Sequence, residues 1–387
     1  MMIMSQKLVP DAEIICQQSR PPVLDVQYHL QNLNVDVSAP STPIFESIPT
    51  GIARFESAMS HTDIMREVTI ESSAAMPFPS IRSGSYADIG TRPSMDDEHI
   101  RIDDLSAQLG SFFKGPSAFY AVFDGHGGSD AAVYMKRNAM RLFFEDAELP
   151  QTSDVDAAFL EALMDSHRKA FLVADIALSD EGSVSSSCGT TALTALVLGR
   201  HLLVANAGDC RAVLCRKGAA VDMSQDHRPS YVPERKRVEE LGGYFEDEYL
   251  NGYLSVTRAL GDWDLKLPLG AASPLIAEPD VQQIMLTEED EFLIIGCDGI
   301  WDVLSSQNAV SFVRRGLRRH NDPELCAREL VNEATRLHST DNLTAVVICF
   351  SSSSLMESSC PPQRQRLRFC GLSEEARNRL RNLFEGN

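Results

Sequence analysis

Four acidic places in this chain share one local pattern: each stands where an apolar, strand-like run begins or ends. A carboxylate at a strand end is carried by a rigid element and faces a cleft at the rim of the sheet. Mg²⁺ and Mn²⁺ prefer oxygen ligands of this kind, so the pattern indicates a site for divalent cations. The four places are Asp96-Asp97, Asp124, Asp298 and Asp341.

The same residues also fit a purely structural role. Asp124-Gly125 and Asp298-Gly299 are Asp-Gly pairs, and Asp-Gly is a common turn dipeptide. One such pair at a strand end indicates only a turn. Two pairs, with carboxylates at two further strand ends, make a metal site as plausible as a set of turns. Spacing alone leaves both interpretations open.

The elements that would position these residues follow one another from about residue 81 to 350. Expected strands cover 81–88, 118–123, 191–198, 201–206, 212–216, 291–297 and 343–350. Expected helices cover 130–145, 154–178, 232–242 and 322–338, with start signals at Ser129, Asp154 or Asp156, Pro233 and Pro323. The short gap between 201–206 and 212–216 predicts a hairpin. Helices are too few to connect every pair of strands, which favours antiparallel sheets covered by helices.

Composition narrows the class of protein. The 387 residues carry a formal net charge of −20, which argues against binding to nucleic acid or to an anionic membrane. The nine cysteines are scattered and include no C-x-x-C motif, so we expect reduced thiols rather than disulfides or a zinc site. No apolar run reaches the roughly 18 residues of a membrane span, and the N-terminus lacks a signal-peptide pattern.

Three regions are expected along the chain. Residues 1–80 are low in aromatic side chains and interrupted by proline and serine, which predicts a mostly disordered extension. Residues 81–351 hold the ordered body. Residues 352–387 form a tail in which Ser373 opens a short amphipathic helix, and a solvated or self-docking tail is the simplest interpretation.

Nine short motifs occur in one order along the body, and together they resemble the metal-dependent serine/threonine protein phosphatases of type 2C over residues 81–351. The motifs and the two extensions are most similar to those of plant members. The motifs are R-P-S-M-D-D (92–97), F-D-G-H-G-G (123–128), S-C-G-T-T-A (187–192), N-A-G-D-C-R (206–211), D-H-R-P (226–229), T-R-A-L-G-D (257–262), E-P-D (278–280), C-D-G-I-W-D (297–302) and D-N-L-T (341–344).

The resemblance implies an α+β fold, a four-layer α/β/β/α sandwich with two central antiparallel sheets and a binuclear metal centre at one end. It implies two Mg²⁺ or Mn²⁺ ions per subunit, and some members of the family have a weaker third site. By motif, Asp124 would bridge the two ions. The Gly125 carbonyl and Asp96 would join it on one ion, and Asp298 and Asp341 would join it on the other.

Further residues follow from the same motifs. Asp97 would order water at the ions, and Asp209 and Asp302, with Asp298, match the third site. The family usually has Glu at the position of Asp96, and the shorter aspartate is a departure that could weaken metal binding on that side.

The resemblance also implies the reaction. A water shared by the two ions would attack phosphorus in line and hydrolyse phosphoserine or phosphothreonine in proteins. Arg92 matches the phosphate-binding arginine, and its fork of donors suits two phosphate oxygens. His126 matches the general acid that protonates the leaving oxygen.

Expected partners are phosphoprotein substrates such as kinases and other signalling proteins, met by a monomer in the cytoplasm or nucleus. Residues 227–275 match the variable flap beside the site. Plant members inhibited by abscisic-acid receptors carry a tryptophan there, whereas residues 243–252 have none. Trp263 and Trp301 fit packing positions better, so no such receptor is expected as a partner.

Three alternatives compete with this reading. A cysteine phosphatase would use C-x5-R, which Cys210 and Arg216 satisfy, but the residues between them read as a strand rather than a phosphate-binding loop. A pseudophosphatase scaffold would bind phosphoproteins or kinases without turnover. A metal-dependent hydrolase of another phosphoester would use the same fold.

Overall fold

A computed structural model describes residues 79–109, 115–145, 155–266 and 272–352. The chain divides by its contacts into residues 1–71 and 72–387, and every described residue belongs to the second unit. The extension predicted for residues 1–80 lies outside the described residues except for its last two, which begin the first strand. The tail helix predicted after Ser373 also lies outside them.

Two five-stranded sheets form the centre of the second unit, and every pairing within them is antiparallel, as predicted. The first sheet has the order β1 (Pro79–Asp88), β15 (Leu343–Ser352), β14 (Asp290–Gly296), β8 (Arg211–Arg216) and β9 (Ala219–Asp222). The second has the order β13 (Asp280–Met285), β7 (His201–Ala207), β6 (Ala192–Leu198), β3 (Ser117–Phe123) and β2 (Glu98–Ile102).

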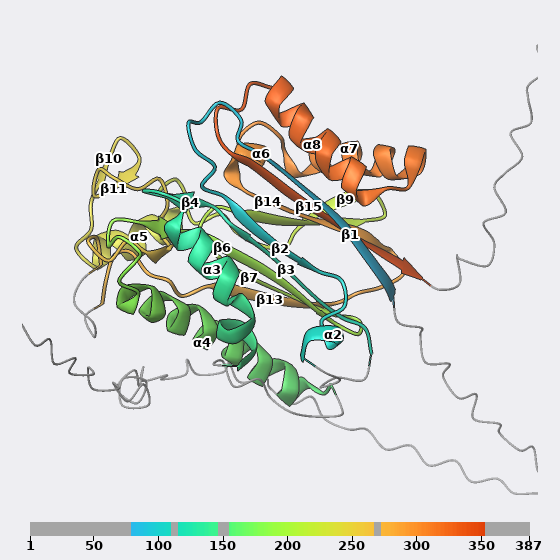
Figure 1. Ribbon diagram of the computed structural model, residues 1–387, viewed down its shortest axis with the longest axis horizontal. Helices are drawn as coiled ribbons and strands as arrows, with labels where there is room; N and C mark the ends of the chain where they lie inside the picture. Colours follow the sequence, from blue (N-terminus) through green and yellow to red (C-terminus); the bar gives the residue numbers. More distant parts are fainter. Residues whose placement is uncertain (1–78, 110–114, 146–154, 267–271, 353–387) are drawn as a thin grey trace, which may run out of the picture. The chain divides into compact units, whose positions relative to one another are not determined.

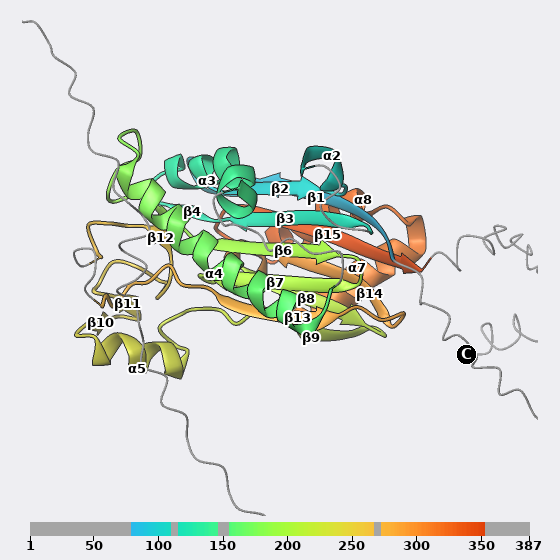
Figure 2. The same ribbon diagram turned by 90° about the horizontal axis from the view of Figure 1, so that it is seen from below.

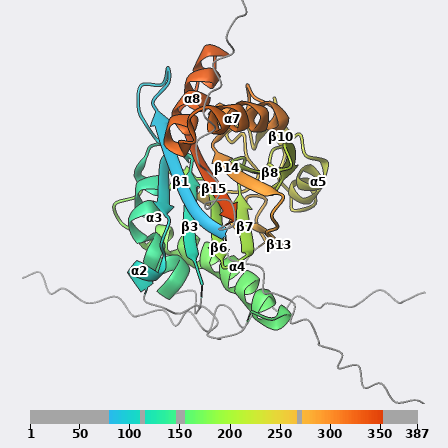
Figure 3. The ribbon, with the colours of Figure 1, turned by 90° about the vertical axis from the view of Figure 1, so that its right-hand side faces the viewer.

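Helices lie on the outer faces of the two sheets (Figure 3). One face carries α3 (Asp130–Met140), which continues as the π-helical turn η1 (Arg141–Glu145), and α4 (Ala157–Asp180). Figure 2 shows α4 lying across the sheet that contains β6, β7 and β13. The other sheet carries α7 (Ser306–His320) and α8 (Pro323–Arg336).

Three apolar clusters fill the spaces between these elements. Phe119 of β3 packs with Phe143 and Phe171 under the helices of one face. Leu193 and Ile295 belong to a second cluster, built from residues of both sheets and lying between them. A third cluster joins β14 and β15 to α7 and α8. Strands such as β3 and β6 are buried at every position, which explains why their apolar runs were readable in the sequence.

The predicted helix starts are confirmed in part. The Asp156 carboxylate accepts a hydrogen bond from the Phe159 N–H, and Asp322 accepts from two N–H groups of α8, as N-cap residues do. Ser129 stands at the N-cap of α3, but its side chain makes no capping hydrogen bond. The helix α7 was not predicted, although Val310, Val313 and Leu317 stand at helical spacing in the sequence.

The predicted hairpin between residues 201–206 and 212–216 is wrong. The strand β7 pairs with β6 and β13 in one sheet, whereas β8 pairs with β14 and β9 in the other. The chain crosses between the sheets at Gly208, whose φ of 122° is open to glycine and strained for other residues. This crossing carries Asp209 to the end of both sheets.

Smaller elements gather at the same end. A three-stranded sheet has the order β12 (Leu260–Gly261), β5 (Gly189–Thr190) and β4 (Gly125–His126). The flap segment contains α5 (Val232–Glu240), β10 (Phe245–Glu246) and β11 (Tyr249–Leu250), and Figure 1 shows these three close to one another. The short helices are α2 (Ser106–Leu109) and α6 (Asp298–Trp301). Within the described ranges, no helix has both the length and the apolar character that a membrane span requires.

Candidate metal centre

The predicted carboxylates meet at one end of the two sheets. Asp97 precedes β2 and Asp124 follows β3, and these strands are neighbours in one sheet. Asp298 follows β14 and Asp341 precedes β15, which are neighbours in the other sheet. In an antiparallel pair the end of one strand meets the start of the next, and the packing of the sheets then brings the two pairs together.

A cavity of about 430 Å³ opens at this end. Of the predicted site residues, Asp97 lies outside its lining with only 4% of its surface exposed, and Asp302 lies outside it at the surface. The other eight line the cavity: Arg92, Asp96, Asp124, Gly125, His126, Asp209, Asp298 and Asp341.

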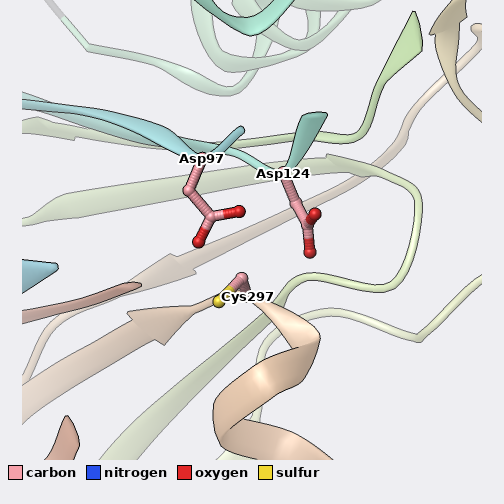
Figure 4. Close-up of side chains that lie close together, drawn as sticks. All are labelled: Asp97, Asp124 and Cys297. Carbon is pink, nitrogen blue, oxygen red and sulfur yellow. The ribbon is translucent and has the colours of Figure 1, made fainter. Parts of the chain in front are cut away.

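Two groups of possible ligand atoms each lie within 4.8 Å of one another, and Asp124 belongs to both. Figure 4 shows Asp97 and Asp124 side by side at neighbouring strand ends, with Cys297 opposite them at the start of α6. Among the described residues, Asp96 and Asp341 line the cavity but belong to neither group. The groups are Asp124, Asp209 and Asp298, and Asp97, Asp124 and Cys297.

Burial disfavours the charged forms of Asp124 and Asp97. Burial, followed by repulsion from Asp97 and Asp298, raises the pKa of Asp124 well above its ordinary value. Burial also raises the pKa of Asp97 to about 6, although the Thr344 hydroxyl donates a 2.6 Å hydrogen bond to its Oδ2. The other oxygen of Asp97, Oδ1, is buried without a hydrogen-bond partner among the described residues. A divalent cation would offset the repulsion between the carboxylates and would give buried oxygens a positively charged partner. The donor set therefore fits a metal.

Cys297 stands beside Asp97 and Asp124 as a buried thiol. Burial raises the pKa of its thiol well above the ordinary value, and nearby Asp97 and Asp124 raise it further. Its sulfur accepts a hydrogen bond from the Thr344 N–H at 3.1 Å. The thiol donates to the Asn342 carbonyl at 3.4 Å and packs beneath the carboxylates (Figure 4).

Arg92 and Asp341 form an ion pair at the rim of the cavity. The Arg92 Nη2 lies 2.6 Å from the Asp341 Oδ2, and this hydrogen bond raises the pKa of Arg92. The Asn342 side chain accepts the N–H of Asp96 at 2.8 Å and donates to two carbonyls of the loop 89–94 at 2.9 Å. The loop that carries Arg92 and Asp96 is thereby fixed to the start of β15.

Gly125 stands where two segments approach too closely for a side chain. A Cβ at this position would lie 2.4 Å from the Asp96 carbonyl oxygen. Asp124 and Asp96 can therefore face the same cavity only because residue 125 is glycine.

His126 pairs with a buried carboxylate to which the sequence analysis gave no role. The His126 Nε2 lies 2.7 Å from Oδ2 of Asp262, whose side chain is 2% exposed. The small sheet aligns them, because β4 holds His126 and Asp262 directly follows β12. The signal that could have found Asp262 was its place at the end of the T-R-A-L-G-D motif.

A second buried pair supports this turn. The Asp175 carboxylate of α4 accepts hydrogen bonds from the Gly261 N–H at 2.8 Å and the Lys266 ammonium at 2.6 Å. The Asp262 N–H donates to the Cys188 carbonyl at 3.1 Å. The Asp262 backbone is thus held on both sides, and the carboxylate has little freedom to leave His126.

Arg228 was also missed, and it lies among three of the predicted ligands. Its Nε is 2.9 Å from Asp209, its Nη2 is 3.2 Å from Asp298 and its Nη1 is 2.8 Å from Asp302. Burial lowers the pKa of Arg228, but attraction to the three carboxylates outweighs it and raises the pKa overall. The signal for Arg228 was the D-H-R-P motif.

The cysteine-phosphatase alternative is excluded. Cys210 and Cys215 are buried, and burial raises the pKa of Cys210 well above the ordinary value and that of Cys215 to about 11. The intervening residues form β8, and Arg216 binds the Asp290 carboxylate rather than facing Cys210. A thiolate nucleophile needs a depressed pKa and a loop that cradles phosphate, and this segment has neither.

Comparison with known proteins gives consistent matches. The family model described as Protein phosphatase 2C matches residues 82–343. Probable protein phosphatase 2C 13 of Arabidopsis thaliana is 59% identical over 397 residues, covering 100% of both chains. Probable protein phosphatase 2C 2 of Oryza sativa subsp. japonica is 56% identical over 388 residues, covering 98% of this chain and 100% of its own.

A solved structure of a C. elegans sex determining protein is similar in fold. It has a TM-score of 0.60 at 23% identity, covering 72% of this chain and 67% of its own.

Proposed function

This chain belongs to the protein phosphatase 2C family and is a metal-dependent serine/threonine protein phosphatase, and on that premise we propose that the cavity at the end of the two sheets is its active site. One observation carries the proposal. The carboxylates of Asp124, Asp209 and Asp298 converge within 4.8 Å from separate strand ends, in the cavity that Arg92 and His126 also line.

The site would hold two cations per subunit, Mg²⁺ or Mn²⁺, with Asp124 shared between them. The convergence of its carboxylate with those of Asp209 and Asp298 supports a central place for Asp124 in the site. The Gly125 carbonyl and Asp96 would join it on one side, and Asp298 and Asp341 on the other. Cations bound here supply a water that is nucleophilic at neutral pH and neutralise charge on the phosphoryl group.

Asp97 would act from behind the cavity. Thr344 holds one of its oxygens at 2.6 Å, and the other has no partner among the described residues. That second oxygen can accept a hydrogen bond from water in the site and so orient it toward the substrate.

Arg92 would bind the phosphoryl group at the rim. Its side chain is 55% exposed, and only one of its donors engages Asp341. A guanidinium has further N–H donors in a planar fork, which suits two oxygens of one phosphate. The ion pair with Asp341 keeps the fork directed to the cavity before substrate arrives.

His126 would protonate the leaving serine or threonine oxygen, and Asp262 would position it. A carboxylate accepts hydrogen bonds, so the 2.7 Å contact places a proton on Nε2 and orients the ring. The opposite ring nitrogen, Nδ1, is then the one that can donate to the leaving oxygen. Asp262 does not touch the substrate in this scheme and acts through His126.

Hydrolysis of a phosphothreonine peptide in Mn²⁺ tests the proposal. Asp124→Ala should lose turnover, whereas Asp222→Ala, which removes an exposed carboxylate on β9, should keep it. Wild-type turnover no faster than that of Asp124→Ala would favour a pseudophosphatase scaffold. Equal rates on phosphotyrosine peptides or nucleotides would favour another phosphoester as substrate.

We also propose the layered arrangement that the family implies, with helix, sheet, sheet and helix layers around a binuclear centre. The apolar cluster between the sheets and the two clusters beneath the helices support it. The catalytic domain would cover residues 81–351, with the flap at about 227–275. A small cluster of its own, including Val238 and Leu250, supports treating the flap as a unit.

Phosphoproteins are the substrates of a protein phosphatase, and we propose kinases and other signalling proteins as their class. A monomer in the cytoplasm or nucleus is proposed from the sequence alone. No abscisic-acid receptor is expected as a partner. In support, the Trp301 indole is buried and donates to the Gly296 carbonyl, and that of Trp263 donates to the Asp175 carbonyl.

A further inference from the structure

We propose that the guanidinium of Arg228 occupies the position of a third metal ion, so that this active site combines two divalent cations with one built-in positive charge. The inference rests on the two-cation site proposed above. By the family resemblance, a third ion would bind Asp209, Asp298 and Asp302. In the structure, the Arg228 guanidinium lies among these three carboxylates.

The guanidinium satisfies all three carboxylates at once. Each of its nitrogens binds a different residue: Nε binds Asp209, Nη2 binds Asp298 and Nη1 binds Asp302, at 2.9, 3.2 and 2.8 Å. A planar fork with five N–H donors suits such a set, whereas the single ammonium of lysine would act as a point charge.

The three carboxylates do not fit one ion while Arg228 lies among them. Oxygens bound to one Mg²⁺ lie within about 4.2 Å of each other, twice the metal–oxygen distance. Asp209 and Asp298 belong to a group within 4.8 Å, together with Asp124. Across the described ranges, Asp302 joins no such group. Asp302 is linked to Asp209 and Asp298 by Arg228, which binds all three.

The backbone on the N-terminal side of Arg228 is pinned. Asp226 binds the Arg211 guanidinium at 2.9 and 2.5 Å. His227 is fully buried, and its Nε2 lies 3.1 Å from the Asp280 carboxylate. With these neighbours fixed, Arg228 can leave the carboxylates only by rotating its own side chain.

A third cation would therefore have to displace a guanidinium held by three ion pairs. Asp209 is 2% exposed and would be left without compensation if Arg228 were removed. Removal of Arg228 should thus open a third site, because an uncompensated buried carboxylate is costly and a cation offsets it. We expect the third ion to bind at least about 10-fold more tightly in Arg228→Ala than in the wild type.

Counting Mn²⁺ on the full chain tests the inference without measuring activity. Metal-free protein is titrated with Mn²⁺, and the free ion is followed by its EPR signal. The variants are Arg228→Ala, Arg228→Gln, which keeps hydrogen-bond donors without the charge, and the control Arg235→Ala. Arg235 pairs with Glu248 in the flap at 2.8 Å and touches none of the three carboxylates. It donates to the Pro229 carbonyl at 3.0 Å, so Arg235→Ala also controls for a disturbed backbone next to Arg228.

The wild type and Arg235→Ala should bind two ions, and both Arg228 variants should bind three. Equal numbers and affinities in the wild type and the Arg228 variants would overturn the inference. Fewer than two ions in the wild type would instead contradict the two-cation centre. If neither Arg228 variant folds, the wild-type titration decides: two ions support the inference, and a third ion as tight as the first two overturns it.

Discussion

Replacing Asp262 by Asn isolates the role of the buried carboxylate behind His126. Asparagine keeps the size of aspartate and tolerates the left-handed backbone at this position, where φ is 53°. It replaces the charged acceptor of the 2.7 Å hydrogen bond to the imidazole with a neutral amide, in a side chain that is 2% exposed. A hydrogen bond to a charged group contributes about 1.5–3 kcal/mol, which corresponds to a roughly 10- to 150-fold loss of rate.

The loss should depend on the leaving group. The threonine side-chain oxygen is a poor leaving group as an alkoxide and needs a proton, whereas p-nitrophenolate is a good leaving group and needs none. Asp262→Asn should therefore slow kcat for a phosphothreonine peptide by the full factor and change p-nitrophenyl phosphate hydrolysis much less. In a His126→Ala background the substitution should have little further effect, because the two residues act as one unit.

Two results would refute this reasoning. Equal slowing of both substrates would mean that Asp262 supports the fold of the site rather than proton transfer. Additive effects of Asp262→Asn and His126→Ala would mean that the residues act independently. Melting temperatures of both variants, measured with Mn²⁺, control for loss of the folded state.

Three further predictions follow from the same geometry. Arg92→Ala should raise KM for a phosphopeptide about 10- to 100-fold and change kcat less, since it removes a phosphate-binding charge; a lower kcat at unchanged KM would contradict that role. Asp124→Asn should abolish Mn²⁺-dependent turnover yet stabilise the metal-free protein by on the order of 1–3 kcal/mol, because it relieves repulsion among the carboxylates; a lower melting temperature in EDTA would argue against this. His167 is buried without a hydrogen-bond partner among the described residues, and burial lowers its pKa from 6.5 to about 4. Between pH 6.5 and about 4, His167 is therefore protonated in the unfolded chain but not in the folded protein. Stability should therefore fall as pH drops from about 6.5 through 4, by on the order of 3 kcal/mol, and His167→Leu should remove that part of the pH dependence in urea unfolding; an unchanged pH profile would show that His167 is not responsible.

Local patterns in the sequence were sufficient for many of the longer elements. Apolar runs such as 118–123 and 192–198 are buried along their whole length, so their composition reflects their place in the centre of a sheet. Asp156 and Asp322 cap helices through contacts to residues two or three positions away. The helix α7 was not predicted, although Ser305 caps it and Val310 and Val313 recur at helical spacing.

The prediction of a hairpin was wrong for a different reason. Closeness along the chain suggested that residues 201–206 and 212–216 pair, yet each strand found its partners elsewhere. Strand pairing depends on which apolar faces can be buried together, and that is a property of the whole fold.

The sequence by itself determined that carboxylates stand at four strand ends, and its motifs identified the family. The tertiary structure decided which of those carboxylates meet. Asp124 comes from one sheet and Asp298 from the other, and Asp209 reaches them only because the chain crosses between sheets.

The contacts of Asp262 with His126 and of Arg228 with three carboxylates were likewise decided by the fold. They join residues as far as 136 positions apart. Residue types and short spacings encode local conformation, whereas such pairings follow from strand register and from the packing of one sheet against another.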